Sequence, residues 1–178
     1  MNKTSLIDFL KQGVDDIVTY AQSVSADAFY FKPAENIWSA AENVQHLMQS
    51  GQPLNRLFGR PKSYFVEKWG QPKHASRSYE EIVNSYHEAL NRMTVTTGAF
   101  SPLTPNEDFV LLLDGFKQEY YVLLSQITQW EEEEFDNYAI PHPLMGLLTV
   151  REMLFFTAYH LRHHHRIMEI RSGLLLSQ

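Results

Sequence analysis

The sequence predicts an all-α protein folded as a helical bundle, and three observations support this fold class. Apolar residues recur at three- and four-residue steps over several long segments. Capping boxes stand directly before three of these segments, at 39–42, 78–81 and 149–152. No alternating strand pattern flanked by hairpin signals occurs in the 178 residues. A chain of this length is also expected to form one domain, residues 1–178.

Five helical segments follow from this periodicity and from the positions of proline and glycine. Thr4 or Ser5 is the expected N-cap of the first helix and Asn106 that of the fourth, while Gly173 is expected to end the fifth. The expected elements are, in chain order, a helix over 4–23, a connector with one helical turn at 25–37, a helix over 40–58, a loop at 59–77, a helix over 79–96, a break at 98–105, a helix over 107–130, a loop at 137–148 and a helix over 150–172.

Two segments stand out by their composition. Loop 59–77 is long for a compact domain and mixes aromatic with basic side chains, and loops of this length are usually functional or mobile. The acidic run Glu131–Glu134, together with Asp136, is expected to form a solvated face where the fourth helix ends, because carboxylates are unfavourable at a helix C-terminus.

Composition excludes several classes of protein. The absence of cysteine rules out a disulfide framework, thiolate zinc fingers, iron–sulfur clusters and a cysteine nucleophile. The formal net charge of −6 argues against a footprint on duplex DNA, which needs clustered cations. Because there is neither a signal-peptide pattern nor a run of 18 apolar residues, we expect a cytoplasmic protein with no membrane association.

Four of the eight histidines lie in one six-residue stretch, 160–165, of the last predicted helix. On a helix, His160 and His164 differ by only about 40° in direction and share the core-facing stripe, whereas His163 is rotated by about 60° and His165 points away. Imidazoles at i, i+4 can hold one divalent ion, as in the helical zinc-protease motif, although Leu161 replaces the glutamate of that motif. The alternative is a buried pair satisfied by hydrogen bonds, and the spacing alone does not decide between them.

Periodicity does not indicate a third ligand, since His46 lies on the flank of the apolar stripe of its helix. The segment 38–47, however, resembles the W-S-x-x-E-x-x-x-H-L signature of the DinB/YfiT-like superfamily. The stretch 143–149, P-x-x-G-x-x-T, followed by 160–164, H-x-x-x-H, matches the second signature of that family in the same order.

The resemblance implies a four-helix bundle of up-down-down-up topology, here with an extra short helix and a long loop. It also implies that His46, His160 and His164 hold one divalent metal ion, zinc or nickel, at one end of the bundle. Imidazole-only ligation suits both ions. The implied activity is that of a metal-dependent thiol S-transferase or hydrolase, in which the metal activates a thiol or a water for attack on a small-molecule substrate. Because the chain lacks cysteine, the thiol would be an external low-molecular-weight thiol.

No catalytic base is assigned, because every candidate has a structural alternative. Glu42 is also the capping-box partner of Ser39. The other candidates are Tyr120 and Tyr121, which are alternatively core or interface rings; His163, for which exposure is the preferred interpretation; and Arg162 and Arg166, which bind thiol carboxylates or complement the helix dipole.

A second class of function is a non-enzymatic, metal-binding stress-response or interaction bundle that forms a homodimer. The apolar stretch 153–156 is broader than one buried stripe requires, so part of it is expected at a two-fold interface. The mixed aromatic and basic segment 56–73 could contact single-stranded nucleic acid. Because the chain is acidic, we expect no nucleic-acid partner and expect loop 59–77 to cover the metal pocket instead.

Overall fold

The structure is a computed structural model that describes residues 1–92, 101–102 and 108–175. Helices dominate these residues, and a single small hairpin accompanies them. The elements are α1 (Lys3–Ser23), α2 (Ala26–Tyr30), α3 (Ala40–Phe58), α4 (Lys62–Trp69), α5 (Tyr79–Asn91), α6 (Phe109–Ile127), α7 (Glu134–Asn137), β1 (Ala139–His142), β2 (Gly146–Thr149) and α8 (Val150–Leu175).

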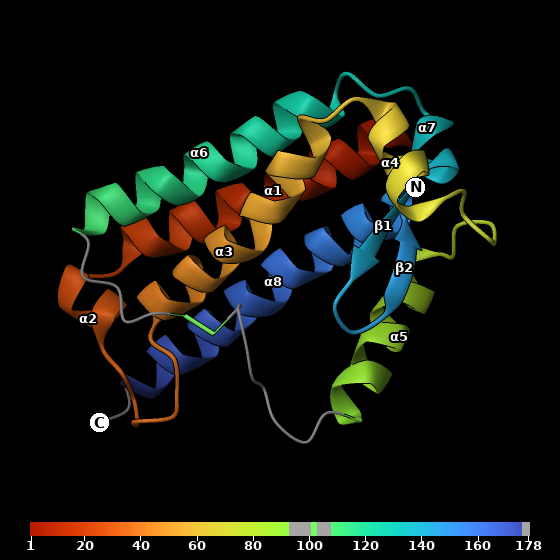
Figure 1. Ribbon diagram of the computed structural model, residues 1–178. Coiled ribbons are helices and arrows are strands. Elements are labelled where there is room, and N and C mark those ends of the chain that lie inside the picture. Colours follow the sequence, from red (N-terminus) through yellow and green to blue (C-terminus); the bar gives the residue numbers. More distant parts are fainter. Residues whose placement is uncertain (93–100, 103–107, 176–178) are drawn as a thin grey trace.

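Four long helices, α1, α3, α6 and α8, form a bundle, which confirms the predicted all-α fold class (Figure 1). Helices α1 and α8 run in one direction and α3 and α6 in the other, which is the up-down-down-up order (Figure 1). Helix α3 packs mainly against α6, and α1 mainly against α8. Helices α3 and α6 are successive helices of the bundle and run in the same direction. The chain between them must therefore return along the bundle, and α4 and α5 lie in this connection.

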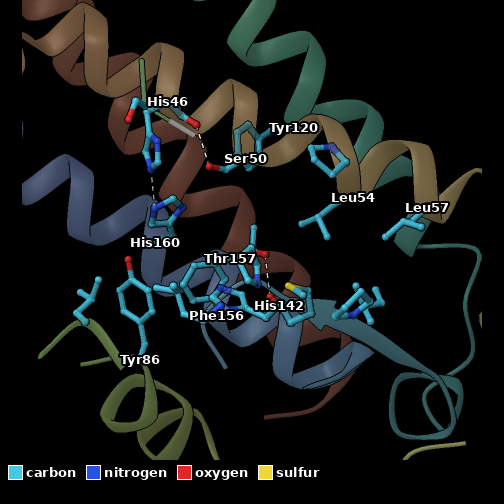
Figure 2. A pocket seen from close by; sticks show the side chains of 18 of the residues that line it. His46, Ser50, Leu54, Leu57, Tyr86, Tyr120, His142, Phe156, Thr157 and His160 are labelled. Atoms are coloured by element: carbon cyan, nitrogen blue, oxygen red, sulfur yellow. Dashed lines mark hydrogen bonds between the residues drawn. The ribbon is translucent and has the colours of Figure 1, made fainter. Parts of the chain in front are cut away.

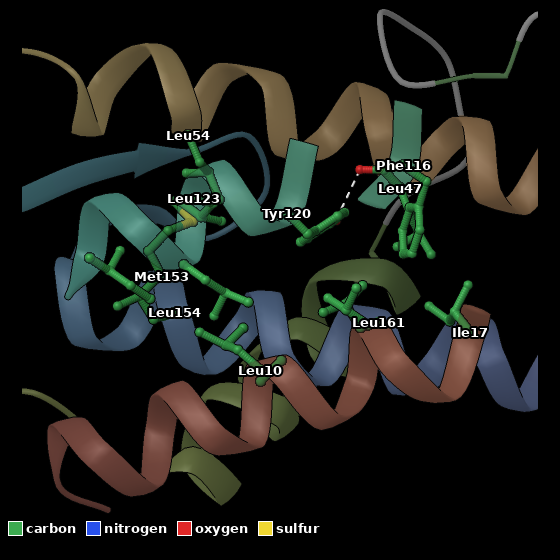
Figure 3. Packing of buried hydrophobic residues seen from close by; sticks show 14 of the residues in the cluster. Leu10, Ile17, Leu47, Leu54, Phe116, Tyr120, Leu123, Met153, Leu154 and Leu161 are labelled. Atoms are coloured by element: carbon green, nitrogen blue, oxygen red, sulfur yellow. Dashed lines mark hydrogen bonds between the residues drawn. The ribbon is translucent and has the colours of Figure 1, made fainter. Parts of the chain in front are cut away.

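The core is built from the apolar stripes that the periodicity indicates. On α1, Leu6, Leu10, Val14 and Ile17 are buried at helical spacing. They meet leucine, phenylalanine and methionine side chains of the other three helices (Figure 3). The ring of Tyr120 is buried in the same core, and its hydroxyl donates to the Leu47 carbonyl at 3.0 Å. Its polar group is therefore satisfied within the bundle.

All three predicted capping boxes are present. Ser39 and Ser78 each accept a hydrogen bond from the backbone N–H of a glutamate three residues on, whose carboxylate accepts from the backbone N–H of the serine. Thr149 makes the same exchange with Glu152, at 3.1 and 3.0 Å. These boxes fix the first residues of α3, α5 and α8.

The other predicted helix ends differ from the structure. Asn2, rather than Thr4 or Ser5, caps α1 and accepts from the Ser5 N–H. Asp108 caps α6, whereas Asn106 lies outside the described residues, as do most of the predicted break at 98–105 and the last turn predicted for 79–96. Helix α8 continues past Gly173 to Leu175.

The predicted loop at 137–148 is wrong, because it contains the antiparallel hairpin β1–β2. Its register runs from Ala139 opposite Thr149 to His142 opposite Gly146. Gly146 has φ 74°, a left-handed conformation that favours glycine and closes the turn. Pro141 is tolerated because a two-stranded hairpin has free edges, where a missing N–H leaves no ladder bond unmade. Strands of four residues are too short to show an alternating pattern.

Loop 59–77 also contains regular structure, namely α4. Phe65 of this helix is buried and packs on Trp130 and Tyr138, with ring centroids 5.3 and 6.0 Å apart. The segment therefore covers the end of the bundle next to α7.

The acidic run is not simply a solvated face, and α6 ends before it, at Ile127. The guanidinium of Arg151 pairs with Glu132 and with Asp136, at 2.7 Å each. Glu132 also accepts from the Lys3 N–H at 2.6 Å. These carboxylates therefore join the start of α8 to the start of α1.

The apolar stretch 153–156 serves packing within the chain. Met153, Leu154 and Phe155 are each less than 5% exposed, and Phe156 is half-buried against the same core. Met153, Leu154 and Phe155 are therefore not available for the homodimer interface expected in this stretch, and the homodimer itself stays a prediction. No helix in the described part of the chain is both long and apolar enough to span a membrane.

We expect Arg151→Ala to lower the free energy of unfolding by about 2 kcal/mol, because it leaves two partly buried carboxylates without their cation. Arg92→Ala is the matched control, since Arg92 pairs with Glu88 on an exposed helix face, and it should cost less than about 0.5 kcal/mol. Urea denaturation measures both values. Equal losses would show that the Arg151 network adds nothing beyond a surface ion pair.

Candidate metal centre

Three histidines from two helices converge at the seam between α3 and α8. The Nε2 atom of His160 lies 3.0 Å from Nε2 of His46 and 3.1 Å from Nε2 of His164. One nitrogen from each ring lies within 4.8 Å of the other two. The three side chains are 5 to 8% exposed, and Figure 2 shows His46 and His160 facing one another. The structure thus brings together all three residues that the sequence nominated.

A hydrogen-bond chain fixes the orientation of His164. The amide of Asn43 donates through Nδ2 to the Ser39 carbonyl at 2.7 Å, which turns its Oδ1 toward His164. Nδ1 of His164 donates to that oxygen at 2.7 Å. A neutral imidazole that carries its proton on Nδ1 has a bare lone pair on Nε2, so His164 directs an acceptor at the other two rings. Partners of this kind orient metal-ligating histidines.

One hydrogen bond cannot account for both short contacts of His160. A neutral His160 has at most one proton on Nε2, and that proton can point at only one of its two neighbours. The other contact then joins two lone pairs or two N–H groups. A cation would accept all three lone pairs, and tetrahedral zinc with bonds of about 2.0–2.1 Å places its nitrogen ligands about 3.3 Å apart. The donor set therefore fits a divalent metal.

Burial keeps these imidazoles in the form that binds a metal. Burial, followed by the neighbouring histidines, lowers the pKa of His160 and of His164 well below 6.5. Both are therefore neutral near pH 7, as ligands must be. Trp38 closes the cluster: its ring is nearly parallel to that of His164 at 6.1 Å and lies 5.1 Å from that of His46.

A cavity of about 300 Å³ adjoins His46 and His160 (Figure 2). Most of its walls come from α3, α5, α8 and the β1–β2 hairpin, and most of its lining side chains are aliphatic or aromatic. The described lining contains no lysine, arginine, aspartate or glutamate. None of it comes from 59–77, so the expectation that this loop covers the metal pocket is wrong.

The fold agrees with the comparisons to known proteins. A model of the DinB superfamily matches residues 10–168. The chain belongs to the DinB superfamily. No curated protein sequence matches the chain at a significant level.

Two solved structures share the fold of this DinB chain. YfiT from Bacillus subtilis, described as a probable metal-dependent hydrolase with an unusual four-helix bundle topology, is 14% identical with a TM-score of 0.64, over 97% of this chain and 87% of that one. The colibactin self-resistance protein ClbS, solved in complex with a dsDNA, is 16% identical with a TM-score of 0.58, over 94% and 93% of the two chains.

The carboxylate and tyrosines considered as catalytic bases have other partners in this DinB chain. Both oxygens of Glu42 are engaged, one by the Ser39 N–H and the other by Lys32, at 2.8 Å each. The hydroxyl of Tyr120 bonds the Leu47 carbonyl, although its ring lines the cavity. Tyr121 is exposed and bonds Asp15 at 3.0 Å.

The basic and histidine candidates on α8 also lie outside the cavity. The Arg162 guanidinium sits 3.6 Å from the Phe9 ring centroid, and Arg166 is exposed. His163 is half-buried rather than exposed, with Nδ1 3.4 Å from the Tyr159 hydroxyl. None of these three side chains lines the cavity in the described structure.

Sequence reasoning missed His142, which the hairpin places on the cavity wall. Its Nδ1 accepts hydrogen bonds from the N–H groups of Leu144 and Met145 at 3.1 and 3.2 Å. Burial lowers its pKa to about 4. The only sequence signal was its place between two prolines, which indicated a loop.

The free energy of unfolding should decrease as the pH is lowered from about 6.5 to about 4. In this range the unfolded chain binds a proton at His142, whereas the folded chain does so only near pH 4. The contribution of this group is complete above pH 6.5 and is lost by up to about 1.4 kcal/mol per pH unit toward pH 4. Urea denaturation at several pH values should show a shallower slope for His142→Asn than for the wild type. Parallel profiles would contradict the buried, neutral state.

Proposed function

We propose that this chain is a metal-dependent enzyme whose cation, zinc or nickel, is held by His46, His160 and His164. The observation that carries the proposal is the convergence of three imidazoles beside a cavity able to receive a small molecule. A divalent cation bound there supplies a Lewis acid that lowers the pKa of a coordinated water or thiol toward 7. The chain's own residues orient the ligands through Asn43 and exclude water through the apolar wall.

We favour water over a thiol as the nucleophile. Low-molecular-weight thiols of the glutathione type carry carboxylates, and the described cavity lining has no cation to bind them. Arg162 packs on Phe9 instead of facing the cavity. The description of YfiT as a probable metal-dependent hydrolase supports the same choice.

The two hydroxyl side chains that α3 and α8 contribute to the cavity wall do not supply an alternative nucleophile. Ser50 donates to the His46 carbonyl at 2.9 Å and Thr157 to the Met153 carbonyl at 2.8 Å. Both bonds return to the preceding turn of the same helix and occupy the proton that a base would have to remove. A hydrolytic reaction with an activated water is therefore the proposal that the site supports best.

A nucleic-acid ligand is not part of this proposal. The likeness to ClbS concerns the fold, and the chain carries a formal net charge of −6. Within the basic segment, Lys62 is paired with Glu134 and lies over the Trp130 ring. The homodimer and the cytoplasmic location stay predictions.

Replacing His46, His160 or His164 with alanine should reduce bound zinc from about one ion per chain to none, because two imidazoles hold zinc far less tightly than three. His165→Ala is the matched control on the same helix and should retain full stoichiometry. Elemental analysis of the purified variants measures the metal, and circular dichroism checks helicity. Undiminished zinc in His160→Ala would refute the assignment.

Turnover distinguishes the enzyme from a metal-binding interaction protein. We expect the zinc-loaded protein to hydrolyse uncharged aryl esters or amides and His160→Ala to be at least about 100-fold slower. Conjugation of glutathione to 1-chloro-2,4-dinitrobenzene should stay at the uncatalysed rate. Zinc-dependent conjugation would overturn the choice of water, and a lack of any zinc-dependent turnover would favour the non-enzymatic alternative.

A further inference from the structure

Two polar groups on the cavity wall lack a hydrogen-bond partner within the described part of the chain. They are the hydroxyl of Tyr86, on α5, and Nε2 of His142, at the end of β1. Tyr86 is 8% exposed and His142 is 7% exposed. Both residues line the cavity, so a molecule bound there can accept a hydrogen bond from either one.

The hairpin turn makes His142 a donor toward the cavity. Its Nδ1 accepts two backbone N–H groups, from Leu144 and Met145, and therefore carries no proton. The proton of the neutral ring must then be on Nε2, across the ring from the turn. Because burial lowers its pKa to about 4, the ring keeps this neutral form through the physiological range.

Tyr86 carries the second donor, on a ring that packs against that of His142. Its ring is perpendicular to that of His142, with centroids 6.2 Å apart. In Figure 2 its hydroxyl points from α5 toward the side of the cavity where His160 lies. Burial raises its pKa to about 12, so the hydroxyl keeps its proton.

One aromatic ring connects both donors to the histidine cluster. The Phe156 centroid lies 4.3 Å from that of His142, 5.0 Å from that of Tyr86 and 5.1 Å from that of His160. Tyr86, His142 and His160 also line one cavity, so a small molecule bound in it lies next to both donor residues and the cluster.

We propose that Tyr86 and His142 form a donor pair that binds an acceptor oxygen, of the carbonyl type, on a small, uncharged and largely apolar substrate. That the bound molecule is a substrate rests on the proposed function, whereas binding by the donor pair does not depend on a metal. A ligand without the oxygen leaves both donors unpaired, which is the strongest basis for discrimination in an apolar site. A carboxylate is disfavoured because no cation in the described lining would balance it.

The test uses two probes of nearly equal shape, acetophenone and α-methylstyrene, in which a methylene replaces the carbonyl oxygen. Each is titrated into the full chain in the presence of EDTA, with binding followed by NMR. The readout is the affinity for acetophenone divided by the affinity for α-methylstyrene. Comparing this ratio between each variant and the wild type cancels the difference in hydration between the probes.

Tyr86→Phe and His142→Asn should each lower this ratio by about three- to tenfold, because each removes one donor to the oxygen. Asparagine retains an acceptor for the turn N–H groups and so preserves the hairpin. Tyr120→Phe is the matched control, since this ring also lines the cavity but its hydroxyl is bonded to Leu47. It should leave the ratio within about twofold.

Unchanged ratios in both donor variants, or no saturable binding of acetophenone at millimolar concentration, would overturn the proposal. A fall in one variant alone would overturn the pair and assign recognition to that residue. Because EDTA removes metal, the result is independent of the zinc measurement. Failure of the metal site and failure of the donor pair are thus seen separately.

Discussion

The lone pairs of three buried imidazoles set the main constraint on this structure. One proton on His160 can serve only one of its two neighbouring rings, and Asn43 fixes the proton of His164 on the far side of its ring. The α3–α8 seam therefore holds three ring nitrogens in an arrangement that a shared cation would suit. The bundle core and the capping box at the start of each helix provide that rigidity.

The up-down-down-up topology explains why the seam also has a cavity. Helix α3 packs mainly on α6, and α8 mainly on α1, so the α3–α8 face is the less closely packed one. The chain that returns from α3 to α6 adds α5 along this opening, and the hairpin before α8 closes another side. The three candidate metal ligands and the cavity therefore both result from the same arrangement of helices.

Local signals in the sequence predicted the helices well because capping boxes and apolar periodicity act within a few residues. The hairpin and α4 escaped prediction because they are short and contain or adjoin proline and glycine. Their stability comes from tertiary packing, as at Phe65 on Trp130. The family resemblance, rather than periodicity, singled out His46. Asn43, Tyr86 and His142 had no sequence signal of their roles, which arise only where separate elements meet.

Strand β2 passes into α8 without an intervening residue, and the Val150 N–H donates to the Tyr138 carbonyl at 2.9 Å. The hairpin wall of the cavity and two of the three candidate ligands, His160 and His164, thus belong to one continuous, rigid stretch of backbone. That wall cannot swing aside without unwinding the helix that carries the ligands. The turn at 143–145, however, can vary in sequence without displacing them, so evolution or protein engineering could reshape the cavity while the imidazoles stay in place.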